Sequence, residues 1–157
     1  MSGKNLALIV IAMAGLSSAI GQTTTSSTRT FNLPPIGLGS SETAEVNVAN
    51  VAVNPNTGTA ASCTGTIVFT NASGGTLGTA TAFTLTAGQA TSVRLPFANA
   101  AGIAPRTVIR AAIHLTIPTT TPRPACSLEF TLETFDSTSG ATHWVITGGG
   151  EISGGRG

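Results

Sequence analysis

The chain has 157 residues, which suits one domain, and only 8% of them are charged, with a formal net charge of +1. So little charge provides no electrostatic footprint for nucleic acid or for an anionic membrane surface, and both are excluded as partners. With 27 threonines, 19 glycines, one tryptophan and no tyrosine, the composition favours β-strands, and it fits an extracellular protein that is repetitive, glycosylated or self-associating.

Residues 1–21 have the pattern of a signal-peptide helix. Lys4 provides a positive charge, residues 6–15 form an apolar run, and small residues follow at the cleavage positions. The run is shorter than the roughly 20 apolar residues of a spanning helix, although a membrane anchor and a buried helix stay open as alternatives. We therefore expect a protein secreted to the extracellular or periplasmic space, with no membrane contact after cleavage. Residues 22–30 are polar and repetitive, which predicts a flexible arm.

The first strands are expected soon after this arm. Residues 31–33 are predicted to form a short edge strand that two prolines end, followed by a glycine-rich turn at 37–39. Residues 43–53 alternate apolar with polar or small side chains, which predicts a strand with one buried face. Residues 54–62 are rich in Asn, Thr and Gly and are predicted to be a loop.

The middle of the chain continues the pattern of short strands and turns. Residues 63–70 and 76–85 are predicted to be the two strands of a hairpin. Residues 86–89, with the sequence TAGQ, form a second tight turn that leads into a strand at 90–97. Residues 98–106 form a longer connection, which we expect to cross between two sheets and to include a helical turn.

Residues 107–117 and 126–135 show the clearest alternation, and we predict that they pair as an antiparallel hairpin across the proline-rich loop 118–125. Their apolar faces match in the register Ile117–Cys126, Leu115–Leu128, Ile113–Phe130 and Ala111–Leu132. The other face then pairs His114 with Glu129 and Arg110 with Glu133, and such surface charge pairs contribute roughly 0.2–1 kcal/mol each.

Residues 141–147 are the last predicted strand, and the glycine-rich residues 148–157 are predicted to be a flexible tail. The folded domain is thus expected at residues 31–147, with seven or eight short strands separated by regular turn signals. Such a pattern predicts an all-β fold, namely an antiparallel β-sandwich of Ig-like architecture.

Cys63 and Cys126 are the two cysteines of the chain. In an oxidising compartment two cysteines form one disulfide by default, and we predict this bond. Two free thiols or a shared metal ion remain as alternatives. A zinc site, however, needs three or four ligands, and neither cysteine has a Cys or His two or three positions away.

Catalytic chemistry finds little support in the residue types. A serine nucleophile would have only His114 or His143 as its base, and no Gly-x-Ser-x-Gly elbow occurs. Glu129 and Glu133 lie about 13 Å apart along one strand, farther than the roughly 5–9.5 Å between glycosidase carboxylates. A metal site formed by His114, His143 and Glu129 is conceivable, but the residue pattern supports it less than it supports surface charge pairs. We predict no enzyme, no cofactor and no metal site. Trp144 is expected either to pack in the core or at its rim, or to be a ligand contact.

Several stretches together resemble a family of small secreted bacterial β-sandwich proteins that is itself uncharacterised. They are ETAEVNVANVAV from Glu42, then Cys63, the hairpin around TLTAGQATSVRLPF, RAAIHL, and CSLEFTLETFDSTSGAT. In that family a strand ending in an E-x-F-D turn follows the second cysteine, and an L-x-x-G-Q turn links two middle strands. The similarity covers roughly residues 31–147. It implies a secreted sandwich with a disulfide, and it implies no catalytic residue and no ligand.

Two functions follow as expectations. The first is a secreted, non-catalytic structural or cell-surface module, which associates with itself or with other surface proteins as a subunit of an extracellular assembly. The low charge and the threonine-rich strands motivate it, because an edge strand can accept a segment of a neighbour. The second is a module that binds a glycan or another ligand through loops 54–62, 98–106 and 118–125, which form a binding surface if they gather at one end of the sandwich.

Overall fold

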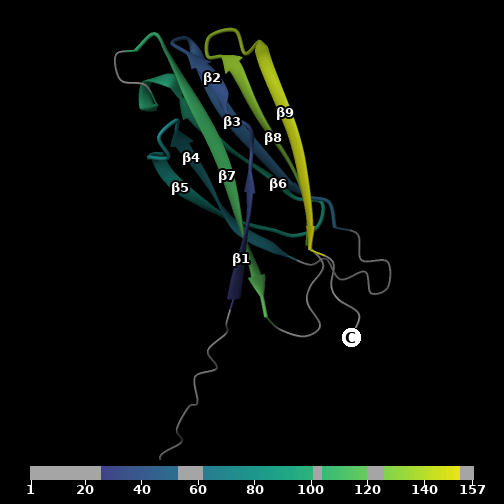
Figure 1. Ribbon diagram of the computed structural model, residues 1–157. Coiled ribbons are helices and arrows are strands. Elements are labelled where there is room, and N and C mark those ends of the chain that lie inside the picture. Colours follow the sequence, from purple (N-terminus) through teal and green to yellow (C-terminus); the bar gives the residue numbers. More distant parts are fainter. Residues whose placement is uncertain (1–25, 53–61, 101–103, 120–125, 153–157) are drawn as a thin grey trace, which may run out of the picture.

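The computed structural model describes residues 26–52, 62–100, 104–119 and 126–152 (Figure 1). The predicted signal-peptide helix and most of the predicted loops 54–62 and 118–125 lie outside these residues. In chain order the elements are β1 (Ser26–Asn32), β2 (Ile36–Gly39), β3 (Glu42–Asn50), β4 (Cys63–Asn71), β5 (Thr76–Leu85), β6 (Ala90–Pro96), the 3-10 turn η1 (Phe97–Asn99), β7 (Arg106–Pro118), β8 (Cys126–Asp136) and β9 (Thr142–Ile152).

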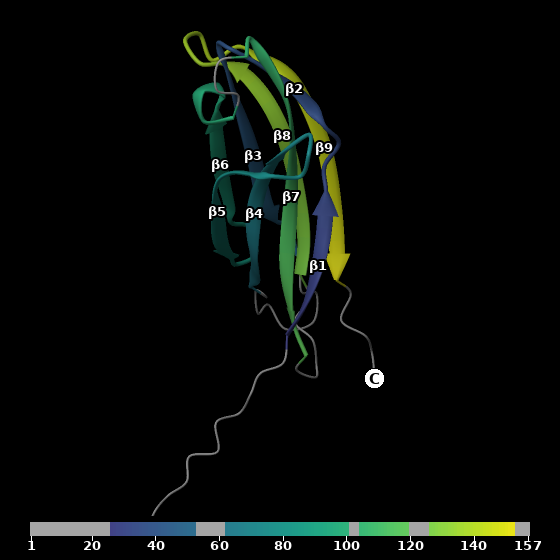
Figure 2. The same ribbon diagram turned by 60° about the vertical axis from the view of Figure 1, so that its left-hand side comes forward.

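The strands form two antiparallel sheets that pack face to face (Figures 1 and 2). Sheet A has the order β1-β7-β4-β5, and β2 continues the line of β1 along the same side of β7. Sheet B has the order β6-β3-β8-β9. The predicted all-β antiparallel sandwich is therefore confirmed.

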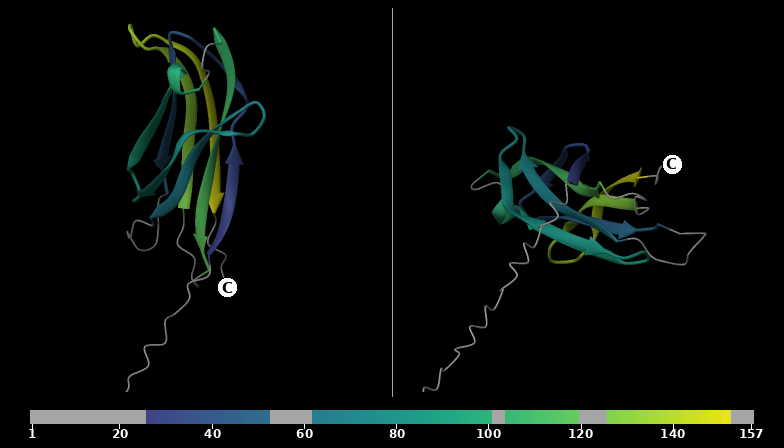
Figure 3. Two further views of the ribbon diagram at one scale, coloured as in Figure 1. Left: turned by 90° about the vertical axis from the view of Figure 1, so that its left-hand side faces the viewer. Right: turned by 90° about the horizontal axis from the view of Figure 1, so that it is seen from below.

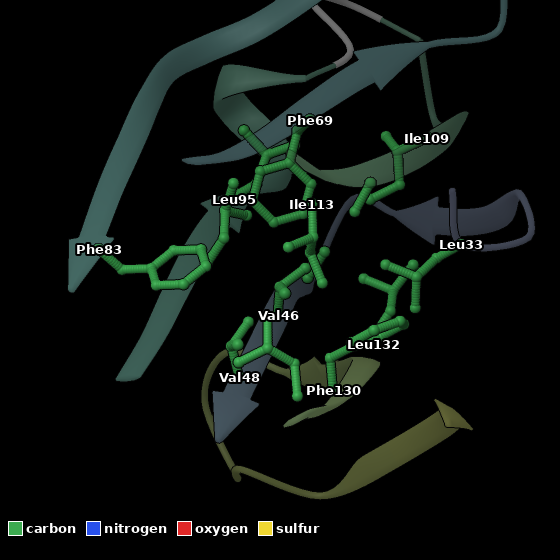
Figure 4. Packing of buried hydrophobic residues seen from close by; sticks show 14 of the residues in the cluster. Leu33, Val46, Val48, Phe69, Phe83, Leu95, Ile109, Ile113, Phe130 and Leu132 are labelled. Carbon is green, nitrogen blue, oxygen red and sulfur yellow. The ribbon is translucent and has the colours of Figure 1, made fainter. Parts of the chain in front are cut away.

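The core lies between the sheets and is built from alternate residues of the central strands (Figure 4). In β7, Ile109, Ala111, Ile113 and Leu115 are buried, while the residues between them face outward and are exposed or partly exposed. Leu128 and Leu132 of β8 do the same from sheet B. The period of two that was read from the sequence thus correctly gives the buried face of each strand.

The predicted hairpin of residues 107–117 with 126–135 is wrong. Strand β7 pairs with β1, β2 and β4 in sheet A, whereas β8 pairs with β3 and β9 in sheet B. Both strands contribute their apolar faces to one core, but from opposite sides. Alternation specifies which face of a strand is buried and leaves open which strand lies beside it, so both arrangements satisfy the same pattern.

Of the two smaller predicted hairpins, one is confirmed and the other is wrong. Strands β4 and β5 pair as predicted, and the Asn71 side chain closes their turn by accepting hydrogen bonds from Ser73 and Gly75. The TAGQ turn is not a hairpin, because it connects β5 of sheet A to β6 of sheet B. Buried Asn50 of β3 holds this turn by donating from Nδ2 to the Leu85 carbonyl at 2.9 Å. The predicted crossing between β6 and β7 is confirmed, with η1 as its helical turn.

Both predicted ends of the domain are also wrong. Part of the segment predicted as a polar arm, Ser26–Thr30, lies in β1, and the predicted glycine turn at 37–39 lies in β2. The tail predicted from residue 148 is strand through Ile152. Its glycines fit there because the Phe31 ring lies over Gly150, at 2.1 Å from where a Cβ atom would stand. Composition suggested flexibility, and close packing between the sheets decided otherwise.

The disulfide between Cys63 and Cys126 is present and joins the start of β4 to the start of β8. Because these strands belong to different sheets, the bond fastens sheet A to sheet B at one end of the sandwich. Both cysteines are buried. No helix long and apolar enough to cross a membrane occurs in the described part of the chain.

Candidate interaction surface

Strand β9 is the outermost strand of sheet B and pairs along one side only, with β8 (Figure 2). Its pairing to β8 is regular from Trp144 to Ile152, after a register shift near Thr142. The side chains of Trp144 and Val145 are 65% and 49% exposed, and they are two of the four exposed large hydrophobic residues in the described ranges. A long edge strand with uncovered apolar side chains is a template for pairing with another chain.

The other edges of the sandwich are interrupted. The edge of sheet A formed by β1 and β2 breaks at Leu33–Pro35 between the two strands. The opposite edges of the two sheets are formed by β5 and β6 (Figure 3). Strand β5 contains a register irregularity against β4, and β6 is short and ends at Pro96. Bulges, prolines and short strands are the devices that protect sheet edges. Among the described strands, β9 thus offers the longest regular edge.

A run of three glycines occupies the second half of β9. A Cβ atom at Gly148 would lie 2.4 Å from the Phe130 ring, and one at Gly150 would lie 2.1 Å from the Phe31 ring. These two glycines are needed so that the aromatic rings can pack against the strand. A Cβ atom at Gly149 would meet only the Leu128 carbonyl oxygen, at 3.5 Å, which is an ordinary contact. The fold of one chain therefore gives no reason for glycine at position 149.

Trp144 stands at a corner where β9 approaches β2 of sheet A. One hollow, of about 190 Å³, is lined by Trp144, Ile146, Arg106 and residues 35–37. A second, of about 490 Å³, adjoins Trp144, Arg106, Glu42 and His143. Arg106 lies flat across Gly37, since a Cβ atom there would lie 2.2 Å from its Nη2. An exposed indole beside a guanidinium can stack on a ring and contact an anion.

A hydrogen-bonded ion pair borders this corner. Glu42 Oε1 contacts His143 Nδ1 at 2.5 Å, and Glu42 Oε2 accepts a hydrogen bond from the Gly39 amide at 2.6 Å. Burial disfavours the charged carboxylate, but the hydrogen bonds from His143 and Gly39 and the charges of His143 and Arg106 outweigh it. Together they hold the pKa of Glu42 below its ordinary value of 4.5.

We expect the Glu42→Gln variant to lose about 1 kcal/mol of stability at neutral pH, because the charged hydrogen bonds disappear. The pKa of Glu42 is lowered in the folded state, so its contribution is present above the ordinary value of 4.5 and is lost as the pH falls through the lower folded-state pKa. Urea unfolding at a series of pH values checks this, since the two proteins should converge in acid. A matched Glu129→Gln change at an exposed position should stay within about 0.5 kcal/mol throughout.

The predicted charge pairs are not formed. His114 and Arg110 belong to β7 and face out from sheet A, whereas Glu129 and Glu133 belong to β8 and face out from sheet B. His114 instead shares a hydrogen bond with Thr30 of β1 at 2.9 Å. The pairs are wrong for the same reason as the hairpin. The set His114, His143 and Glu129 is not gathered either, because His143 contacts Glu42 at the β9 corner.

The outer face of sheet B carries a different set of polar contacts, which the sequence reasoning missed. Arg94 of β6 donates to Glu45 of β3 at 2.7 Å, and Asn47 donates to Glu133 at 2.9 Å. Glu45 and Glu133 lie opposite each other in the register of β3 and β8, so each carboxylate is given its own donor. In the sequence, Arg94 in the middle of a predicted strand indicates a polar contact on the outer face. Its partner could be identified only once β6 was known to lie beside β3.

The three loops proposed as a ligand site do not gather at one end. Strand β7 ends at Pro118, and β8 begins at Cys126 with the disulfide. The strand ends that loop 118–125 connects therefore lie at the disulfide end of the sandwich. Residues 98–106 connect Pro96 to Arg106, which pair with Thr43 and Gly39 at the other end of the sandwich. The arrangement at one end is therefore not found. Ligand binding by the loops, whose residues 54–61, 101–103 and 120–125 lie outside the described ranges, stays a prediction.

Comparisons with protein-family models, with curated proteins and with solved structures found no match to this chain. The resemblance to a family of small secreted bacterial proteins thus stays a prediction. Of the predicted site residues, Cys63 and Cys126 form the disulfide, and Trp144 lies at the corner with Arg106, Glu42 and His143, where its role as a ligand contact stays a prediction.

Proposed function

We propose that this chain is a non-catalytic structural module of Ig-like architecture, secreted to the extracellular or periplasmic space, which assembles with other chains through the free edge of β9. The observation that carries the proposal is the regular edge from Trp144 to Ile152, which pairs on one side only and exposes Trp144 and Val145. Main-chain hydrogen bonds along such an edge supply affinity, and alternate side chains supply specificity. The buried disulfide is compatible with an oxidising compartment.

The solution mass of the chain, measured by light scattering from micromolar to millimolar concentration, tests this proposal. We expect the mass to rise with concentration and the amide hydrogens of β9 to exchange more slowly in the assembled form. A single-chain mass at all concentrations contradicts it, as does assembly that protects only β5, β6 or β1.

A pair of matched variants locates the surface. Val145→Lys places a lysine on the β9 edge, and Val108→Lys makes the same change on β7, an inner strand of sheet A where Val108 is 44% exposed. Lysine on an edge strand discourages pairing with another strand. We expect the first variant to weaken assembly and the second to leave it unchanged.

Ligand binding is the second candidate, favoured by the exposed Trp144 beside Arg106 and the two hollows. A glycan with a carboxylate would suit the pair, since its ring can stack on the indole and its anion can contact the guanidinium. Because Trp144 is the only tryptophan, its fluorescence reports binding directly. We expect a uronate-bearing polysaccharide to shift the emission and Arg106→Gln to weaken that shift, with Arg110→Gln on the same strand as the control. An unchanged emission with neutral and acidic polysaccharides alike removes this candidate.

A further inference from the structure

We propose that the partner of β9 is β9 of a second copy, paired antiparallel about a two-fold axis at Thr147. This inference rests on the proposed function and specifies the partner and the register. It joins the two four-stranded sheets B into one continuous eight-stranded sheet. A two-fold interface uses the same patch on both copies, so the edge must be complementary to itself.

The sequence of β9 meets this requirement around Thr147. The four residues before it, HWVI, are large, and the four after it, GGGE, are three glycines and one glutamate. Antiparallel pairing centred on Thr147 sets Trp144 opposite Gly150 of the second copy, Val145 opposite Gly149 and Ile146 opposite Gly148. Each large side chain thus meets a position without one, and each of these pairs occurs twice.

The pairing also keeps the faces of the sheet in order. Trp144 and Ile146 lie on the inner face of sheet B, opposite Thr134 and Leu132 of β8, and Gly148 and Gly150 lie on that same face. Val145, Thr147 and Gly149 lie on the outer face. In this register even-numbered residues pair with even-numbered ones and odd-numbered with odd-numbered ones, so inner residues meet inner residues. A shift of one residue between the two strands would pair inner residues with outer ones.

The inner face gains the largest contact. Phe31 already lies over Gly150 of its own chain, so Trp144 of one copy would settle beside Phe31 of the other. An aromatic side chain opposite a glycine covers the bare backbone of an edge, and aromatic pairs add to apolar burial. The 65% exposure of Trp144 in the single chain would fall accordingly.

The outer face agrees with this register. Gly149, for which the single chain gives no packing reason, lies opposite Val145 of the second copy. Thr147 faces Thr147 across the axis, a pair whose hydroxyls can hydrogen-bond.

Charge substitutions on the axis test the register. In the Thr147→Lys variant two lysines face each other, and in Thr147→Glu two glutamates do, so each variant alone should dimerise about fivefold more weakly than the natural chain. When the two variants are mixed, lysine faces glutamate. We expect the ratio of mixed dimers to like dimers to lie about tenfold above its statistical value. Because lysine and glutamate residues have nearly the same mass, one variant is labelled uniformly with nitrogen-15, so that native mass spectrometry separates the mixed dimer from the two like dimers.

Val145→Lys mixed with Val145→Glu is the control. Those residues face Gly149 rather than each other, so the mixed dimer should stay near its statistical share. A chain that is monomeric up to millimolar concentration overturns both the proposed function and this inference. Dimers that form but show no preference in the Thr147 mixture overturn the register alone and leave assembly through another pairing.

Discussion

Replacement of both Cys63 and Cys126 by alanine is expected to lower the free energy of unfolding by about 4 kcal/mol. The disulfide joins residues 63 positions apart, and in the unfolded chain it removes the entropy of a long open loop. It also fastens sheet A to sheet B at one end, since β4 and β8 belong to different sheets.

Urea unfolding of the double variant beside the natural chain, with and without a reductant, measures this effect. The reduced natural chain should approach the double variant, whereas the double variant should not respond to reductant. A loss below about 1 kcal/mol would show that the unfolded chain is compact enough without the bond, since residual structure weakens the entropic effect.

Truncation of Ile113 to alanine is the second large effect, with an expected loss of about 2–5 kcal/mol. Ile113 is fully buried at the centre of β7, where it packs in the core between the sheets (Figure 4). Removal of its outer carbons forfeits transfer free energy and leaves a cavity that the surrounding strands can fill only in part.

Val108→Ala is the matched control, because Val108 lies on the same strand with an exposed side chain. It should change the free energy of unfolding by no more than about 0.5 kcal/mol. Urea midpoints with unchanged slopes give both values. Similar losses for the two variants would contradict the assignment of inward and outward faces in β7.

The β9 edge shows where sequence reasoning misjudged a segment. Residues 148–157 have the composition of a linker, and glycine weakens a strand that stands alone. Beside β8, however, Gly148 and Gly150 receive the rings of Phe130 and Phe31, which a side chain at either position would displace. Only the tertiary structure reveals that need, across the β8–β9 pair for Gly148 and between the two sheets for Gly150, and with it the edge on which the proposed function rests.

Trp144 shows the same limit for the candidate site. Its alternation within residues 141–147 indicated a strand, and its type indicated either packing or a ligand contact. Its neighbours Arg106 and Glu42 come from the ends of other strands, far away in the sequence. No local pattern connects these positions, so the corner they form could not be predicted.

The sequence by itself determined the all-β class, most strand positions, the buried face of each central strand and the disulfide. The strand properties are local, because side chains alternate along a strand and turn residues mark its ends. The disulfide could be predicted because two cysteines allow a single pairing. Only the tertiary structure decided which strands are neighbours, as it placed β7 and β8 in different sheets and left β9 at an edge. Strand partners are chosen by packing and hydrogen bonding across long loops, and the same alternation satisfies several choices until the whole core is assembled.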